Sequence, residues 1–478
     1  ILSSPVVCHG ETGRDGNDGV DGIDGVDGID GIDGIDGEDG LSTGITLSNI
    51  PAGATCAAGG TLISLFLDSN RNGQQDGNEP TTTSRTVCNG EKGDQGGGND
   101  PIVCKQITVK PLKELIMVDP LVVEDKRALP GGAWHFGSLI RQMLPADASA
   151  AETTDFVLSW LQSWEADVTI GSSTADARPA ITNQIICPWI NASFNNSNCQ
   201  GNIDLDQAPL RLLAIVNRLD LGDGETVAGE GRFVFSVLNA PTDNPIDNGF
   251  SERFTVILEY DLPLAQHTPQ EWAVEFHKLG KLPCDELQGC ESYNQQLESL
   301  TDKFSGRGMD PTKPNGNPLN QLRTNEIALD SIWELREFNL RMESGDTLLR
   351  QVDVKQTPDA SFDGTSALAD FAEANKALIA NAKHTIPQNM VAAASQIPFG
   401  FPGWQLPGKS EALQQAFSVN TCSGCHHSDT ATIDLFYHIS PVQNAGVGRL
   451  SQFLRGELEG PRKANMEQVA LPPICRDL

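Results

Sequence analysis

Apolar and polar positions along the middle and end of this chain follow two periods, one typical of strands and one of helices. Runs such as RFVFSVL and FTVILEY are rich in β-branched and aromatic side chains and are bounded by turn-forming residues, a pattern that predicts strands. We predict strands over residues 210–219, 232–238, 254–260, 320–329, 333–341 and 347–354. The intervening Asn, Pro, Asp and Gly residues favour antiparallel pairing between neighbours.

Helical periods occur between these strand clusters. Residues 153–165 repeat Phe, Leu and Trp at helical spacing, and residues 366–383 form an amphipathic pattern. The segment Thr268-Pro-Gln-Glu271 has the residues of a capping box with proline at the first helical position, which predicts a helix to about residue 279. Because strands and helices cluster rather than alternate, we predict an α+β class, with a large antiparallel-sheet-plus-helix body over residues 101–408.

The N-terminal segment has a different period, with glycine at every third position from Gly10 to Gly40. Only glycine fits at the axis of three wound polyproline-II chains, so the repeat predicts a collagen-like triple-helical rod over residues 1–40 and a homotrimer. Aspartate precedes nearly every glycine, so stacked chains would need bridging divalent cations. An acidic, disordered linker is the alternative interpretation.

Residues 68–79, DSNRNGQQDGNE, match the spacing of an EF-hand calcium loop. The expected ligands at loop positions 1, 3, 5, 7, 9 and 12 are Asp68, Asn70, Asn72, Gln74, Asp76 and Glu79. Strand-like flanks at 61–67 and 82–87 predict a small calcium-binding β-hairpin module within residues 41–100, bracketed by Cys56 and Cys88. A plain Asn/Gly turn is the alternative.

The order of these features, a Gly-X-Y tract, a D-x-N-x-N-G hairpin closed by VCNG and a short second glycine tract, resembles modules of large bacterial surface proteins. The resemblance covers residues 8–100. It implies an architecture and no activity. Separately, the Gly-X-Y segment leads us to expect self-association and, through it, a filament.

Charge and cysteine content narrow the class of protein. The chain has 33 Lys and Arg against 64 Asp and Glu, a net charge of −31, which argues against binding to nucleic acids or anionic membranes. Eleven cysteines indicate an oxidising compartment, so we expect an extracellular or cell-surface protein without a membrane span and with its signal peptide already removed. The pairs Cys187/Cys199 and Cys284/Cys290 are spaced to close small loops.

The most specific motif is Cys422-Ser-Gly-Cys425-His426, the c-type haem attachment sequence C-x-x-C-H. Two thiols three positions apart can form thioethers to both vinyl groups, and the adjacent imidazole then lies under the iron. A tight disulfide and a Cys/Cys/His/His zinc knuckle are the alternatives.

Residues 409–470 resemble a minimal class-I cytochrome c, with helices before and after the motif. The resemblance implies covalent haem on Cys422 and Cys425 with His426 as proximal ligand, in a C-terminal helical c-type haem segment spanning 409–478. Cytochromes of this family usually supply a methionine downstream of the motif as the sixth iron ligand. Here the only methionine after the motif is Met466, which lies beyond the second expected helix. We therefore expect His438, which lies among apolar residues, to be the sixth ligand, with a buried core histidine as the alternative interpretation, while His384, Met390 and Met466 stay open.

Two functions follow from these features. The first is an extracellular monohaem c-type cytochrome, displayed or assembled through the stalk, that transfers electrons to an unknown redox partner. The alternative is a structural or adhesive fibre subunit in which CxxC is a disulfide and haem is absent. A haem peroxidase would need distal acid and base groups that the sequence does not nominate. No hydrolase motif occurs, so an electron-transfer or structural role is favoured over catalysis.

Overall fold

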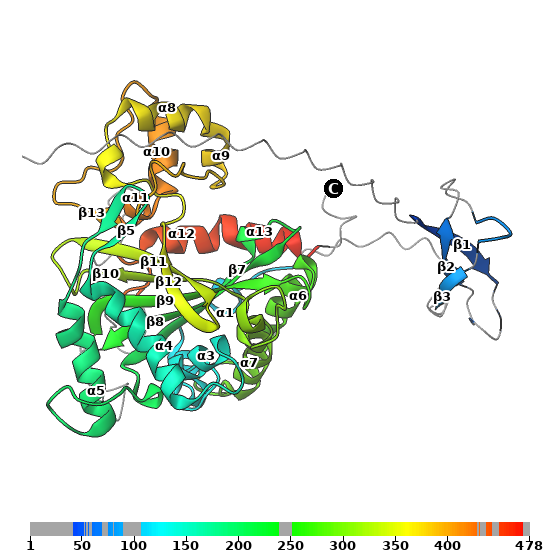
Figure 1. The fold of residues 1–478 in the computed structure, drawn as a ribbon, viewed down its shortest axis with the longest axis horizontal. Coiled ribbons are helices and arrows are strands. Elements are labelled where there is room, and N and C mark those ends of the chain that lie inside the picture. Colours follow the sequence, from blue (N-terminus) through cyan, green and yellow to red (C-terminus); the bar gives the residue numbers. More distant parts are fainter. Residues whose placement is uncertain are drawn as a thin grey trace, which may run out of the picture. The chain divides into compact units, whose positions relative to one another are not determined.

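The computed structural model describes residues 42–51, 53, 56, 60–68, 75–79, 81–88, 107–238, 251–427, 430, 436–441 and 449–471 (Figure 1). The chain divides into two compact units, Ile1–Pro101 and Ile102–Leu478. The predicted Gly-X-Y rod lies outside the described residues, so self-association through it stays a prediction.

The first unit contains a three-stranded antiparallel sheet of β1 (Ser42–Ile50), β2 (Gly60–Asp68) and β3 (Thr81–Cys88), in that order. The predicted hairpin is confirmed as the β2–β3 pair, in which Thr61 lies opposite Val87. Strand β1 was not expected, and it covers the free edge of β2 along the whole length of both strands. Phe66 on the central strand is fully buried.

The second unit is built on one large antiparallel sheet with the strand order β12-β11-β10-β9-β8-β7-β4, and β13 pairs with β11. Its strands are β4 (Ile116–Met117), β7 (Leu210–Arg218), β8 (Val227–Leu238), β9 (Ser251–Pro263), β10 (Leu319–Glu326), β11 (Trp333–Glu343), β12 (Asp346–Val352) and β13 (Ser395–Ile397). A separate pair comprises β5 (Val168–Ile170) and β6 (Ser173–Ala175). The six predicted strands and the antiparallel pairing are confirmed.

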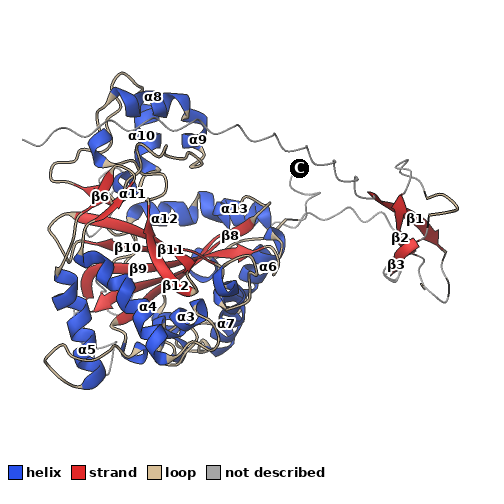
Figure 2. Ribbon diagram, in the orientation of Figure 1, coloured by secondary structure: helices blue, strands red, loops and turns tan. Residues whose placement is uncertain are grey.

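Helices cover one face of this sheet (Figure 2). The α-helices up to residue 305 are α1 (Pro111–Glu114), α2 (Pro120–Val123), α3 (Phe136–Met143), α4 (Ala150–Gln162), α5 (Cys187–Phe194), α6 (Pro269–Leu279) and α7 (Glu291–Ser305). Both predicted helices in this region are present as α4 and α6, and the capping box of Thr268 and Glu271 is formed. Helix α7 packs on β9, α3 on β7 and α4 on β12.

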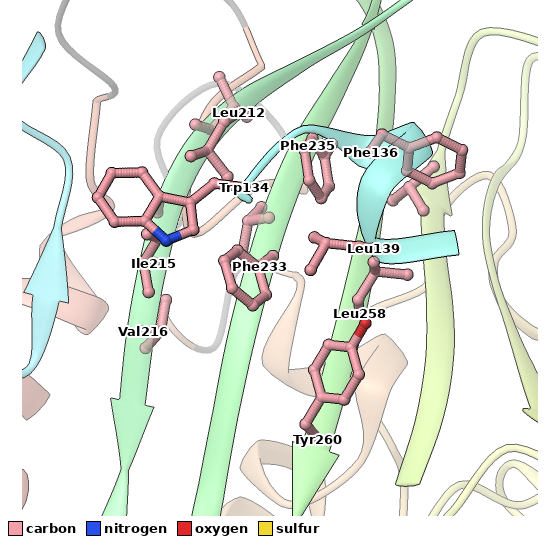
Figure 3. Packing of buried hydrophobic residues seen from close by; sticks show 14 of the residues in the cluster. Trp134, Phe136, Leu139, Leu212, Ile215, Val216, Phe233, Phe235, Leu258 and Tyr260 are labelled. Carbon is pink, nitrogen blue, oxygen red and sulfur yellow. The ribbon is translucent and has the colours of Figure 1, made fainter. Parts of the chain in front are cut away.

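The main hydrophobic core fills the space between these helices and the sheet (Figure 3). Aromatic side chains from the start of α3 meet those of β8 and β9, with Phe136 and Phe235 in an edge-to-face contact at 5.6 Å. The inward positions of β8 alternate along the strand, as Phe233 and Phe235 do, because successive side chains of a strand point to opposite faces.

The other face of the sheet carries charged side chains. Arg232 lies opposite Glu259 across β8 and β9, Glu259 opposite Gln321, and Arg323 opposite Glu337 across β10 and β11. Ion pairs link Arg232 to Glu259 at 3.2 Å and Arg323 to Glu337 at 3.0 Å. These carboxylates are almost fully buried, so another part of the chain must cover this face.

The C-terminal quarter supplies α8 (Ser366–Ala374), α9 (Lys376–Ala380), α10 (Glu411–Val419), α11 (Cys422–Cys425), α12 (Gln452–Glu459) and α13 (Pro461–Val469). The predicted helix over 366–383 is two helices, α8 and α9, separated at Asn375. Helices α8 to α10 share a small second core that includes Trp404 and Phe417. In Figure 2, α12 and α13 lie on the opposite side of the sheet from α3, α4 and α7.

The predicted four-part architecture is wrong. Its C-terminal segment does not form a separate helical haem unit: the end of the chain has only the short pair α12 and α13, and Leu454, Leu458 and Met466 of this pair belong to the main core. No rod is evident among the described residues, and the fold is a mostly antiparallel sheet body with helices. The cause is that the last helices, which also pack on each other, bury apolar residues in the main core of the sheet body instead of forming a separate core.

Candidate functional site

The CxxCH motif lies on the single helical turn α11, directly after α10. Thr421 caps this turn, since its hydroxyl accepts a hydrogen bond from the Gly424 amide at 3.1 Å. The Cys422 amide donates to the hydroxyl of Thr357 at 2.9 Å, and the Trp404 indole donates to Ser423 at 3.1 Å. These contacts fix the motif between the second core and the loop that follows β12.

Gly424 makes this packing possible. A Cβ atom at this position would lie 2.1 Å from the carbonyl oxygen of Ser418 at the end of α10. The glycine between the two cysteines is therefore required by the close approach of α10 and α11 rather than by an unusual backbone angle.

Cys422 and Cys425 are unpaired thiols, whereas two other cysteine pairs form disulfides. Cys187–Cys199 and Cys284–Cys290 are bonded, which confirms the two loop-closing pairs expected from the sequence. Burial and, as a smaller effect, the neighbouring Cys422 together raise the pKa of the Cys425 thiol to about 12. Burial also raises the pKa of Cys422, although the Arg323 charge opposes this shift.

His426 is held by backbone and aromatic contacts. Its Nδ1 lies 2.6 Å from the carbonyl oxygen of Phe436, which can only accept, so Nδ1 carries the proton and Nε2 is left with its lone pair. The ring stacks on Trp333 with centroids 5.1 Å apart and planes 26° apart. Asn325 supports both partners: its amide donates to the Phe436 carbonyl at 3.3 Å, and its oxygen accepts from the Trp333 indole.

His438 lies beside the motif but not opposite His426. Its Nε2 is 3.3 Å from the sulfur of Cys425, and its Nδ1 is 2.9 Å from the hydroxyl of Ser451. The rings of His426 and His438 are in contact, with centroids 4.6 Å apart. That His438 is the sixth ligand therefore stays a prediction.

The donor set nevertheless fits a c-type haem in its proximal half. A haem-ligating or metal-ligating histidine commonly donates its other ring N–H to a backbone carbonyl, which orients the ring and raises the basicity of the ligating nitrogen. His426 makes this hydrogen bond, and the two thiols precede it on the same turn. Burial lowers the pKa of His426 to about 4, so the neutral, ligating form is the one present near neutral pH.

Other candidate ligands lie elsewhere. Met466 is fully buried in the main core, where its sulfur lies 3.8 Å from the Asn217 amide. Met390 packs in a small cluster with Ile386, and His384 contacts the carbonyl oxygen of Gln356 at 3.1 Å. His427 lies next to Phe401, with ring centroids 5.6 Å apart.

The predicted calcium loop is described in part. Asn70, Asn72 and Gln74 lie outside the described residues. Asp68 and Glu79, at loop positions 1 and 12, are buried to 5% and 4% exposure. Glu79 closes the end of the loop, because its carboxylate accepts from the amide of Asp76 at 3.0 Å. Within the described ranges, no cluster of three or more His, Cys, Asp or Glu side chains is arranged to hold a metal ion.

Sequence reasoning missed the residues that support the motif. Asn325, Trp333 and Thr357 lie between 65 and about 100 positions before it and reach it only through the sheet. A signal was present in the strand LRTNE, where the polar side chains Arg323 and Asn325 alternate with buried positions in a central strand. Such alternation in a covered sheet indicates a polar site on that face.

Comparison with known proteins gives one partial match. A family described as a domain of unknown function (DUF7151) matches residues 44–88, which span β1 to β3 of the first unit. No curated protein and no solved structure matches this chain. Of the helices that the structure describes, none is long and apolar enough to cross a membrane.

Proposed function

We propose that this chain is an exported c-type cytochrome, working outside the cell or at its surface, that carries one haem and transfers electrons. In this proposal Cys422 and Cys425 hold the haem covalently and His426 is an axial ligand. The haem, when bound, supplies one-electron chemistry at its iron. The observation that carries the proposal is the His426 ring, whose Nδ1–H is held by the Phe436 carbonyl beside two unpaired thiols.

The surroundings of the motif support this proposal. Burial dominates the pKa shifts of Cys425, His426 and His438, and yet each of these side chains keeps part of its surface accessible. Trp333 supplies a flat aromatic wall on which the His426 ring is fixed.

The alternative of a fibre subunit with a CxxC disulfide is less well supported. Among the described residues, Cys187–Cys199 and Cys284–Cys290 form disulfides, and the sulfurs of Cys422 and Cys425 are unpaired although only two residues separate these cysteines. A disulfide between the two cysteines would not require the ring of His426 to be oriented. Haem ligation through Nε2 would require it.

A spectrum tests the proposal. The full chain, expressed in a bacterial host that matures c-type cytochromes, should show an α-band in its reduced-minus-oxidised spectrum after acid-acetone extraction. Cys422→Ala with Cys425→Ala should lose the band to extraction, and His426→Ala should abolish or shift it. The matched control is His427→Ala, which changes the adjacent histidine and should keep the band. Absence of the band in the parent chain would refute the proposal.

We also propose that the loop between β2 and β3 binds calcium. The support is the burial of Asp68 and Glu79, two carboxylates at the ends of the predicted ligand set, beside the three-stranded sheet that the structure describes in this unit. A buried carboxylate is costly unless hydrogen bonds or a cation compensate its charge. With three charged ligands, we expect weak affinity, on the order of 10⁻⁴–10⁻³ M, as in extracellular modules.

A further inference from the structure

The carbonyl oxygen of Phe436 accepts hydrogen bonds from two side chains. Nδ1 of His426 donates to it at 2.6 Å, and the side-chain amide of Asn325 donates to it at 3.3 Å. The amide nitrogen of Asn325 also lies 3.5 Å from Nδ1 of His426. Both of these nitrogens carry hydrogen and neither offers a lone pair, so the contact between them is not a hydrogen bond. His426 therefore shares its acceptor with a second donor that lies beside the ring.

The indole of Trp333 determines which way the Asn325 amide points. An indole N–H can only donate, and it donates to the side-chain oxygen of Asn325. The amide nitrogen must then face His426 and Phe436. Asn325 is 3% exposed and Trp333 is fully buried, so bulk water does not compete for these hydrogen bonds.

The backbone of Phe436 is held in a conformation that a residue with a side chain rarely adopts. Its φ is 83°, in the left-handed region. The ring stacks on Trp333 with centroids 6.1 Å apart and planes 29° apart, and the carbonyl is held by His426 and Asn325. A strained conformation of this kind persists only where the surrounding contacts determine it, and such residues cluster at functional sites.

We propose that Asn325 is a positioning residue that raises the reduction potential of the haem proposed on Cys422 and Cys425, because it shares the Phe436 carbonyl with His426. This inference rests on the proposed haem function. A strong hydrogen bond from Nδ1 makes the imidazole a more basic ligand through Nε2, which favours the oxidised iron.

Two effects of Asn325 oppose that stabilisation of the oxidised iron. Its amide withdraws electron density from the Phe436 oxygen and so weakens the hydrogen bond that this oxygen accepts from His426. The partial positive charge of the amide hydrogens also lies beside the His426 ring, where it disfavours the additional positive charge of the oxidised state. Both effects raise the potential.

The midpoint potential of the haem-loaded full chain tests the proposal. In Asn325→Leu, which removes the donor, the ratio of reduced to oxidised protein at a fixed electrode potential should fall about tenfold, a lowering of the midpoint by about 59 mV. The matched control is Asn339→Leu, the same exchange later in β11, which should keep the midpoint of the parent. A midpoint that is unchanged or raised in Asn325→Leu would overturn the proposal, since a merely structural role would lower stability alone.

A second variant covers the case in which Asn325→Leu does not fold or does not load haem. Trp333→Phe keeps an aromatic ring beside His426 and removes the N–H that orients the amide. The amide oxygen can then turn toward Nδ1 of His426 and accept from it, so the midpoint should fall in this variant too. An unchanged or raised midpoint would count against the role of Asn325.

A haem-free chain allows the same hydrogen bonds to be measured without iron. In the full chain with Cys422→Ser and Cys425→Ser, ¹⁵N NMR of labelled histidine near neutral pH should show His426 with its proton on Nδ1. Adding Asn325→Leu should move the resonance of this proton downfield, because the Phe436 carbonyl then accepts from His426 alone. A proton on Nε2, or a resonance that does not move, would contradict the shared carbonyl.

The haem proposal and the role of Asn325 fail in different measurements. A parent chain without an α-band would refute the cytochrome and, with it, any effect on its potential. A parent chain with a full α-band and a midpoint that Asn325→Leu does not change would refute the role of Asn325 alone.

Discussion

Among single residues, His135 links burial most directly to stability. It is 4% exposed and precedes α3, where its Nδ1 accepts a hydrogen bond from the Gly137 amide at 3.2 Å. Accepting that bond requires an unprotonated Nδ1. Burial lowers the pKa of His135 to about 4, well below the value of about 6.5 in an unfolded chain.

The sign of the resulting pH dependence follows from this shift. As the pH falls from 6.5 to 4, the unfolded chain takes up a proton at His135 and the folded chain does not, so the free energy of unfolding decreases, by about 3 kcal/mol in all. We predict that His135→Asn, which keeps an acceptor at the cap and cannot titrate there, flattens this decrease. Urea unfolding at pH 7.0, 5.5 and 4.5 measures the free energy of unfolding at each pH. An equal fall in this free energy with pH in parent and variant would contradict the prediction.

Among elements, the contact of α10 with α11 should be the least tolerant of added volume. Gly424→Ala would place its Cβ against the Ser418 backbone, whereas a Cβ added at Gly456 in α12 would meet no described atom within 4 Å. We predict that Gly424→Ala displaces the motif turn and lowers both thermal stability and covalent haem content. Gly456→Ala, the control, should stabilise its helix by about 0.5–1 kcal/mol, because alanine favours helix over glycine. Similar outcomes for both variants would contradict the predicted packing.

Strands β10 and β11 share a buried ion network with the loop after β6. Arg178 contacts Glu326 at 2.5 Å and Glu334 at 3.2 Å, and Arg336 contacts Glu334 at 2.6 Å, all with side chains at most 4% exposed. Burial raises the pKa of Glu326 to about 7, despite the opposing charge of Arg178.

We predict that Arg178→Met destabilises the second unit by about 3–5 kcal/mol, because it leaves two buried carboxylates without their shared partner. Arg350→Met is the control. It breaks an exposed pair with Glu343 and should change stability by at most about 1 kcal/mol. Chemical denaturation of both variants tests this, and a loss below about 1 kcal/mol for Arg178→Met would show that the network contributes little.

At the scale of helices and strands, the sequence predicted the elements in which the pattern of apolar residues is long. Six of the eight described strands of the large sheet and the helices α4, α6 and α10 were predictable, because each repeats apolar residues over several turns or alternations. The helix predicted over 366–383 divides because Asn375 leaves the helical conformation and its side chain bonds back to the carbonyl of Phe371 at 2.9 Å. Periodicity cannot detect such a local competition.

For the whole molecule, the division into two units predicts that calcium stabilises one unit and leaves the other unchanged. Asp68 and Glu79 belong to the first unit, whereas the CxxCH motif belongs to the second. We predict that calcium raises the unfolding midpoint of the first unit alone, and that Asp68→Asn with Glu79→Gln removes this effect. The haem α-band should not change. Calorimetry with calcium and with chelator measures both, and a calcium effect that survives in the variant would exclude the loop as the site.

The sequence by itself determined the local chemistry: the CxxCH motif, the spacing of the calcium loop, the two small disulfide loops and the antiparallel strands. These depend on residues that lie within a few turns of one another, so their pattern is visible along the chain. The tertiary structure alone decided what surrounds the motif. Strand pairing brings Asn325 and Trp333 to His426. Contacts of this kind depend on which faces of distant elements are buried together, and no linear spacing encodes them.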